Sequence, residues 1–359
     1  MDAFKDATRI LLMRLDNIGD VVMLSPAVRA LRRAAPRARI SLMASAAGAA
    51  VAGLLPGLDE VFVHRALWQD ARGAMAFDPK RERESVRDLA ARGFDVAVIF
   101  TSFSQSPFPA AYACYLAGIP VRIAQSREFG GGVLTHWVRP LPDSAHQVDR
   151  NLHLLKEVGI SVGGPGASSL RLAVPREARG RAEAMLRERG VRGDFVVIAP
   201  GATCAARRYP AEQYGLVAAG LQALGRQVVV VGGPKDLAIG EAVVAAAPGS
   251  VSLCGQTGLA ELAALLQRSR LLVANDSGPM HIADAVGCPM VVLYSGTELE
   301  EQWRPRTAPA RILRRPTACS PCYRFECPYD LECLRIAPGE VVAQARALLG
   351  ETLREVADG

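Results

Sequence analysis

The feature that most constrains the fold is a regular alternation of short apolar runs with longer helical patterns, found in both halves of the chain. Runs rich in Val, Ile and Leu that alternate with helices are typical of βαβ units around a parallel sheet. We predict strands at 9–15, 39–45, 60–64 and 95–100 in the first half, and at 195–200, 227–233, 271–276 and 290–295 in the second.

The length of 359 residues favours two domains, because a single hydrophobic core seldom grows this large. A stretch rich in Gly, Ser and Pro at 160–170 is typical of a boundary. We therefore predict α/β domains at 1–170 and 171–340, and a terminal helix at 341–359 that could pack back on the first domain. Ligands of such sheets bind beyond the carboxyl ends of the strands, so we expect the chemistry in the loops there, facing a cleft between the domains.

The net charge of +6 is uneven, because residues 1–175 hold 21 Lys and Arg against 16 Asp and Glu. A basic cluster is either a solvated helix face or an attraction for an anionic acceptor or membrane surface. The absence of interleaved aromatic residues argues against nucleic acid. The uncharged stretch 40–58 is too weakly apolar for a membrane span, and we expect no secretory signal. The cluster consists of Arg29, Arg32, Arg33, Arg37 and Arg39.

The loop after the first predicted strand carries Asp16, Gly19 and Asp20. Glycine permits a tight turn and a close approach to a ligand. A carboxylate at this position is either a helix cap or a general base that faces the cleft, and the residues alone leave both readings open.

Two loops of the second half have the composition of phosphate-binding turns. The first, at 201–210, holds Thr203 and Arg207, and hydroxyl, guanidinium and backbone N–H groups there would suit a phosphate. An ordinary turn with exposed arginines is the alternative. The second loop begins a helix after the strand at 271–276, and helix N-termini attract anions. Its candidate residues are Asp276, Ser277, Gly278 and His281.

Neither loop has the pattern of a nucleotide-hydrolysing P-loop, and no dinucleotide-binding glycine motif follows the first strand. These absences disfavour both classes of enzyme. Two phosphate-type loops in one domain instead predict a diphosphate ligand.

The segments ILLMRLDNIGDVVMLSPAVRALRRAAP, HQVDRNLHLLKEVGI, PGATCAARRYP and NDSGPMHIADAVGCPMVVLYSGT, in this order, resemble the family 9 glycosyltransferases, the heptosyltransferase group. The resemblance covers nearly the whole chain, and the DSGPMH motif is its most specific part. It implies a GT-B architecture of two Rossmann-like domains, with the acceptor on the first domain, the nucleotide sugar on the second and catalysis in the cleft.

The resemblance also implies roles for particular residues. Asp20 falls on the catalytic base. The acceptor-side candidates come from the loop and the basic cluster described above, and they are Asp16, Gly19, Arg32 and Arg33. The donor-binding positions are Thr203, Arg207, Asp236, Asp276, Ser277, Gly278 and His281. The chain departs from the family pattern where Arg207 replaces Lys, Tyr209 replaces Trp and Cys204 enters the loop. Arginine keeps the charge but not the geometry of lysine.

Four cysteines, Cys319, Cys322, Cys327 and Cys333, form a compact cluster near the end of the chain. Four clustered thiols without a secretory signal favour a structural metal over disulfides, but their spacing is not that of a zinc ribbon. The sequence leaves bound metal, disulfides and free thiols open, and it predicts no metal in the catalytic site.

The function that the resemblance implies is transfer of a sugar, heptose from ADP-heptose, to an anionic lipopolysaccharide-type glycolipid. The implied enzyme inverts the anomeric centre, needs neither metal nor cofactor, and is cytoplasmic, either free or in peripheral contact with the inner membrane. A nucleotide-sugar epimerase and a non-catalytic nucleotide-sugar-binding protein of the same fold are the alternatives. The nucleotide base, the sugar, the acceptor and the oligomeric state stay open.

Overall fold

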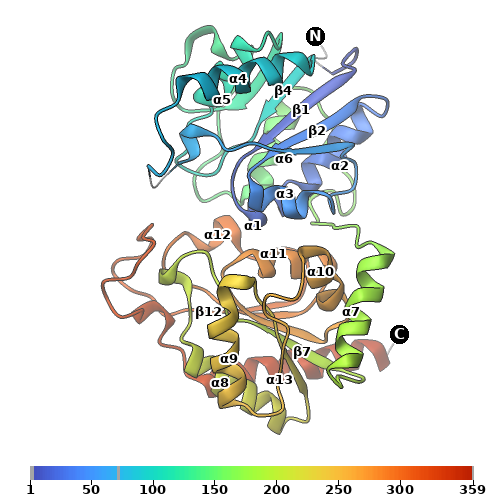
Figure 1. The fold of residues 1–359 in the computed structure, drawn as a ribbon, viewed down its shortest axis with the longest axis vertical. Coiled ribbons are helices and arrows are strands. Elements are labelled where there is room, and N and C mark those ends of the chain that lie inside the picture. Colours follow the sequence, from blue (N-terminus) through green and yellow to red (C-terminus); the bar gives the residue numbers. More distant parts are fainter. Residues whose placement is uncertain (1–3, 71–72, 358–359) are drawn as a thin grey trace. The chain divides into compact units, whose positions relative to one another are not determined.

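The computed structural model describes residues 4–70 and 73–357, with side chains described as far as residue 350. The chain divides into two compact units, Met1–Arg171 and Leu172–Gly359. In Figure 1 the first unit runs from blue to green and the second from light green to red. Each unit is an α/β domain with its own sheet and core.

The first unit is built on a parallel sheet of six strands in the order β3-β2-β1-β4-β5-β6. The central strands are apolar on both faces, as expected for a sheet covered by helices on two sides. Strands β1 to β4 fall within one residue of the predicted starts and ends. The strands are β1 (Arg9–Arg14), β2 (Arg39–Ala44), β3 (Glu60–Val63), β4 (Val96–Ile99), β5 (Val121–Gln125) and β6 (His136–Val138).

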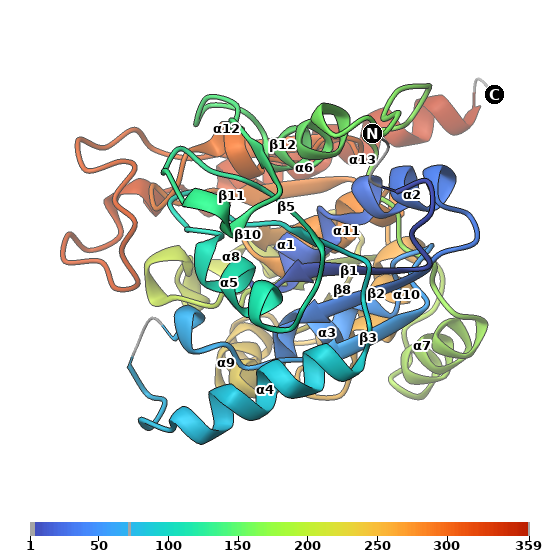
Figure 2. The ribbon, with the colours of Figure 1, turned by 90° about the horizontal axis from the view of Figure 1, so that it is seen from above.

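Helices cover both faces of this sheet. On one face α4 (Pro79–Ala91) and α5 (Phe108–Leu116) pack against each other, and their buried side chains meet those of Leu11, Met13 and Ile99. On the other face α2 (Ser25–Ala34) packs with α6 (Gln147–Glu157) (Figure 2).

The uncharged stretch 40–58 forms β2 and the short helix α3 (Ala46–Ala52), as predicted. Its small residues have a packing reason: a Cβ added at Gly48 would lie 2.7 Å from Val21 Cγ2 in α1 (Ile18–Val22). No helix in the described part of the chain is long and apolar enough to cross a membrane.

The second unit repeats the plan with a parallel sheet in the order β12-β11-β10-β7-β8-β9. Four of its strands were predicted. The strands are β7 (Phe195–Ala199), β8 (Gln227–Val230), β9 (Val251–Ser252), β10 (Leu271–Asn275), β11 (Met290–Leu293) and β12 (Ala310–Leu313). Those that the sequence analysis missed in either unit (β5, β6, β9 and β12) have at most five residues, and most contain polar or charged ones.

The helices of the second unit also form two layers. Helix α8 (Ala211–Ala223) packs with α9 (Leu237–Ala246), and α7 (Arg176–Glu188) and α11 (Gly278–Val286) both contact α10 (Leu259–Arg268).

The terminal helix α13 (Pro338–Ala357) packs on α8 and on strand β11 of its own unit (Figure 1). An apolar stripe on the helix, formed by Val341, Ala345 and Leu348, is fully buried in the core of the second sheet. The helix is therefore part of the core of the second unit, and a contact with the first domain stays a prediction.

Each sheet has a point at which its strand order reverses. In the first unit the chain proceeds from β1 outward to β3 and then returns to place β4 on the other side of β1. In the second unit β10 takes the same position beside β7. Loops that leave neighbouring strands in opposite directions open a crevice at such a switch point, where ligands of this class of sheet bind.

Candidate functional site

A cluster of ionised side chains lies at the switch point of the first unit. Arg14, the last residue of β1, is completely buried and is paired with two carboxylates. Its Nε lies 2.9 Å from Asp16 Oδ2, and its Nη2 lies 2.6 Å from Asp20 Oδ1. A buried guanidinium between two carboxylates leaves a formal charge of −1 in a poorly solvated place, which is a setting for proton transfer.

Asp20 is both a helix cap and part of this cluster. Its Oδ2 accepts a hydrogen bond from the backbone N–H of Asn17 (3.1 Å), which closes the first turn of α1. Its Oδ1 accepts bonds from Arg14 and from the Ser102 hydroxyl (2.9 Å), which follows β4. Residues of β1 and of the loop after β4 therefore both hold this side chain. A helix cap alone needs only the bond from the Asn17 N–H.

Asp16 is held by Gln105, whose Nε2 donates to Asp16 Oδ1 (2.7 Å) and whose Oε1 accepts from the backbone N–H of Ser102 (3.0 Å). Burial raises the pKa of Asp16, the nearby charge of Asp20 adds to this, and Arg14 and Gln105 oppose it. The two carboxylates thus share one cation, and burial makes Asp16 hold a proton more readily than an exposed aspartate does.

The structure separates the other acceptor-side candidates. Gly19 is buried in α1 beside Asp20. Arg32 lies near the start of β2, at the opposite end of the strands, because α2 runs antiparallel to the sheet. Its guanidinium donates to the carbonyls of Gly57 (3.0 Å) and Ala38 (2.7 Å). Arg33 is exposed on the same end of α2. Neither arginine belongs to the cluster around Asp20.

The switch point of the second unit is organised by Asn275, the last residue of β10. Its Nδ2 donates to the carbonyl of Pro200 (2.7 Å), after β7. Its Oδ1 accepts from the backbone N–H of Tyr209 (3.0 Å) and from the Tyr214 hydroxyl (2.9 Å). One completely buried amide therefore joins the two loops that the sequence singled out as phosphate-type turns.

Arg207 is the cation of this second cluster. Its Nη2 lies 2.8 Å from Glu298 Oε1, and its Nε donates to Thr297 Oγ1 (3.0 Å), both in the loop after β11. Burial lowers the pKa of Arg207, but the negative charges of Asp276 and Glu298 outweigh this and raise it, so the guanidinium stays ionised. It is thus a fixed positive charge between loops from β7, β10 and β11.

Asp276, the first residue after β10, is buried and only 2% exposed. Its Oδ2 has no hydrogen-bond partner among the described residues, and burial raises its pKa against the opposing charges of Arg207 and His281. Ser277 is the N-cap of α11, but its hydroxyl points back to the carbonyl of Asn275 (3.3 Å) and caps no N–H. Pro279 has no N–H, and the N–H of Met280 donates to the carbonyl of Ser277 (3.1 Å), so the amide at this helix start that suits an anion is that of Gly278.

The remaining donor-side candidates are placed less centrally. Thr203 is exposed at the outer part of its loop. Asp236 accepts a hydrogen bond from the backbone N–H of Gly233 (2.9 Å), which caps the turn after β8. Its carboxylate also packs on Gly201, where an added Cβ would lie 2.6 Å from Oδ1. Asp236 is therefore next to the loop after β7.

The cysteine-rich segment at 319–333 is hydrogen-bonded to two loops of this cluster. The N–H of Tyr323 donates to the carbonyl of Thr297 (2.9 Å), and the N–H of Ala206 donates to the carbonyl of Phe325 (3.0 Å). All four cysteines of the segment are free thiols, and no group of three or more His, Cys, Asp or Glu in the described part of the chain is arranged to hold a metal ion. The segment links the loops on both sides of Arg207 through its backbone.

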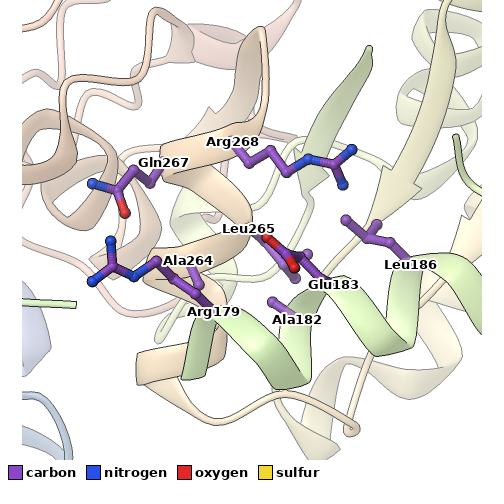
Figure 3. A pocket seen from close by; sticks show the side chains of 8 residues that line it. All are labelled: Arg179, Ala182, Glu183, Leu186, Ala264, Leu265, Gln267 and Arg268. Carbon is purple, nitrogen blue, oxygen red and sulfur yellow. The ribbon is translucent and has the colours of Figure 1, made fainter. Parts of the chain in front are cut away.

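A separate cavity of about 260 Å³ lies between helices α7 and α10 (Figure 3). No residue of either cluster lines it. Its lining side chains are Arg179, Ala182, Glu183, Leu186, Ala264, Leu265, Gln267 and Arg268.

Several residues of the two clusters were not recognised in the sequence. Arg14 ends the apolar run of β1. The others stand at the end of a strand or in the loop that follows one, so their position relative to the strands is the signal that could have found them. These residues are Ser102, Gln105, Asn275, Thr297 and Glu298.

Residues 83–332 match the model of glycosyltransferase family 9 (heptosyltransferase). The chain is 26% identical over 351 residues to lipopolysaccharide heptosyltransferase 3 of Escherichia coli K12, covering 93% of this chain and 96% of the relative. The fold is similar to that of a family 9 glycosyl transferase from Veillonella parvula, with a TM-score of 0.77 and 24% identity over 98% of this chain and 99% of the other.

A second similar structure is the ADP-heptose lps heptosyltransferase II of E. coli, with a TM-score of 0.74 and 24% identity. The alignment covers 96% of this chain and 99% of that one. These likenesses extend over both units and confirm the GT-B fold class, two Rossmann-like domains each built on a parallel sheet.

Proposed function

The chain belongs to glycosyltransferase family 9, the heptosyltransferase family, and on that premise we propose that it transfers heptose from ADP-heptose to a lipopolysaccharide-core acceptor. The names of its relatives support this donor and this class of acceptor. The observation that carries the proposal is the pair of clusters at the two switch points. One holds two carboxylates on a single buried guanidinium, and the other holds a fixed cation beside a helix N-terminus that has no side-chain cap.

In the proposed reaction the acceptor hydroxyl loses its proton to Asp20 as its oxygen attacks C1 of the heptose. The bond from C1 to the diphosphate breaks on the opposite face, so the anomeric centre is inverted and ADP leaves. Arg14 and Ser102 orient the carboxylate through the bonds described above. A positioned general base of this kind contributes about 10²–10⁴-fold to the rate.

The departing diphosphate gains negative charge as the bond breaks. We propose that Arg207, the N–H of Gly278 and the dipole of α11 stabilise it, with His281 one turn into the helix as a further donor. A fixed guanidinium and a helix N-terminus would supply the charge that other transferases take from a divalent metal. The proposed reaction therefore requires no metal.

Thermal unfolding of the purified protein with a panel of nucleotides tests the donor. ADP and ADP-heptose are expected to raise the melting temperature more than UDP, GDP or AMP, because a ligand that binds only the folded form stabilises it. Product analysis with and without a lipopolysaccharide-core acceptor then separates transfer from epimerisation and from binding alone.

Turnover that persists in EDTA supports metal independence of the proposed reaction, whereas a full loss of turnover that Mg²⁺ restores would contradict it.

We also propose a peripheral membrane contact through helix α5. Tyr112, Tyr115 and Leu116 are each more than half exposed there, beside an apolar cavity of about 250 Å³ between α4 and α5. Exposed aromatic and apolar side chains favour the interfacial region of a bilayer. Co-sedimentation with vesicles that contain phosphatidylglycerol is expected to fall several-fold in a Tyr112→Ser, Leu116→Ser variant. The matched control is Leu216→Ser, at an exposed leucine of α8, and equal sedimentation of all three proteins would exclude this contact.

A further inference from the structure

A polar cavity of about 190 Å³ adjoins the cluster around Asp20 and lies wholly within the first unit. Its walls come from the loops after β4, β5 and β6 and from α6. Ser102 and Gln105, which bind the two carboxylates of the cluster, also line it. A ligand in this cavity would therefore be next to the proposed general base.

One wall holds a buried amide without partners. Gln125, the last residue of β5, is 2% exposed, and among the described residues neither its Oε1 nor its Nε2 has a hydrogen-bond partner. Leaving a buried donor or acceptor unpaired costs about 1–3 kcal/mol. An amide of this kind is poised to bind a ligand group that both donates and accepts, as a sugar hydroxyl does.

A second wall holds a cation that is poorly compensated. Arg150 of α6 is 5% exposed, its guanidinium lies 4.2 Å from the centre of the Phe103 ring, and its Nε has no hydrogen-bond partner. The nearest carboxylate oxygen, Asp143 Oδ1, is 4.0 Å from Nη1. Burial, with a smaller contribution from the positive charges of Arg127 and Arg14, lowers the pKa of Arg150 to about 10, although the charge of Asp143 opposes this.

The acidic groups of the cavity are already engaged elsewhere. Asp143 receives two hydrogen bonds of 2.9 Å from Arg127, and Glu128 accepts one of 3.0 Å from the Ser106 hydroxyl. These pairs leave the charge of Arg150 as the one least neutralised in the wall. An oxyanion placed against it would gain a charge-assisted hydrogen bond and stabilise the buried cation.

We infer that this cavity binds an acidic sugar ring of the acceptor, with Arg150 on its carboxylate or phosphate and Gln125 on a neighbouring hydroxyl. The inference rests on the proposed function in taking the occupant to be the acceptor. It assigns selection of the acceptor to the loops beyond β4, β5 and β6 of the first unit, and not to the basic cluster on α2.

Direct binding of simple sugars tests the inference without any donor. Isothermal titration at low ionic strength is expected to show glucuronate or glucose 6-phosphate binding about tenfold or more tightly than glucose, because hydrogen bonds to charged groups are the strong ones. Inorganic phosphate is the third arm. If glucuronate binds most tightly, the group that Arg150 recognises is a carboxylate; if glucose 6-phosphate does, it is a phosphate. If inorganic phosphate binds more tightly than either sugar, the cavity does not recognise a sugar ring.

Two variants locate the site. Arg150→Gln is expected to remove the preference for the charged sugars, and Gln125→Leu to weaken charged and neutral sugars alike. Arg139→Gln, which removes an exposed arginine outside the cavity, is the matched control and is expected to bind as the unmodified protein does. If Arg150→Gln does not fold, Gln125→Leu alone decides, and unchanged affinities in that variant overturn the inference.

The outcome is distinguishable from that of the proposed function. A protein that transfers heptose but shows no preference among the sugars refutes only the cavity inference. A protein that binds acidic sugars through Arg150 but transfers nothing refutes only the proposed reaction.

Discussion

Replacement of Asp20 by Asn is expected to lower the turnover number by about 10²–10⁴-fold, which is the usual contribution of a positioned general base. Asparagine keeps an oxygen that can accept from Arg14 and Ser102, so the cluster should stay assembled. It cannot take the proton of the acceptor hydroxyl. Affinity for ADP, measured by titration calorimetry, should be unchanged, because the proposed donor site lies in the other unit.

The competing role of Asp20 makes a different prediction. If the carboxylate only caps α1, Asp20→Asn should cost stability, about 1 kcal/mol for a lost cap, and leave the turnover number intact. Asp16→Asn is the matched control, since it removes the other carboxylate bound to Arg14. A larger loss of turnover in Asp16→Asn than in Asp20→Asn would transfer the role of base to Asp16, whose pKa burial raises.

The sequence located the loops of both clusters better than it located their contacts. Strands with apolar residues on both faces are recognisable from composition, and in a parallel sheet their carboxyl ends share one edge. Asp16 and Asp20 follow β1, and Asp276 and Ser277 follow β10, so one rule placed all four near an edge. The predicted strands themselves are all present.

Contacts between loops depend on the order of strands, and the alternation of strands and helices does not encode that order. Ser102 reaches Asp20 only because β4 returns to the side of β1. Thr297 reaches Arg207 only because β11 pairs with β10, which brings the loop after β11 close to the loop after β7. Residues of this kind look like ordinary turn residues in a sequence, since their partners are far away along the chain.

The basic cluster shows the converse case, in which charge alone leaves a solvated face and an anion-binding surface both open. The guanidinium of Arg32 donates to the carbonyls of Pro36, Ala38 and Gly57. These bonds tether the end of α2 to the turns that follow it. Arg29 does the same for the segment near Ser169. A count of arginines cannot separate such tethers from an anion-binding surface, because both are basic and both lie partly in solvent.

Replacement of Arg207 by Ala is expected to weaken ADP binding by about 10–100-fold, the range of a lost hydrogen bond to a charged group. Removal of the guanidinium has a second effect, because it takes away a positive charge that acts on both Asp276 and Glu298. The negative charge of these carboxylates would then repel the diphosphate more strongly. The loss should therefore be larger for ADP than for AMP, and titration of both nucleotides measures the difference.

Two further variants separate charge from geometry. Arg207→Lys keeps the charge but loses the planar fork, so it should bind ADP between the unmodified protein and Arg207→Ala. Glu298→Gln removes the carboxylate that lies 2.8 Å from Arg207 and frees the guanidinium for the ligand, so its affinity for ADP should be equal or higher. ADP affinity that is unchanged in Arg207→Ala would remove Arg207 from the donor site. A loss in Glu298→Gln as large as in Arg207→Ala would mean that the ion pair, and not the cation, shapes the loop.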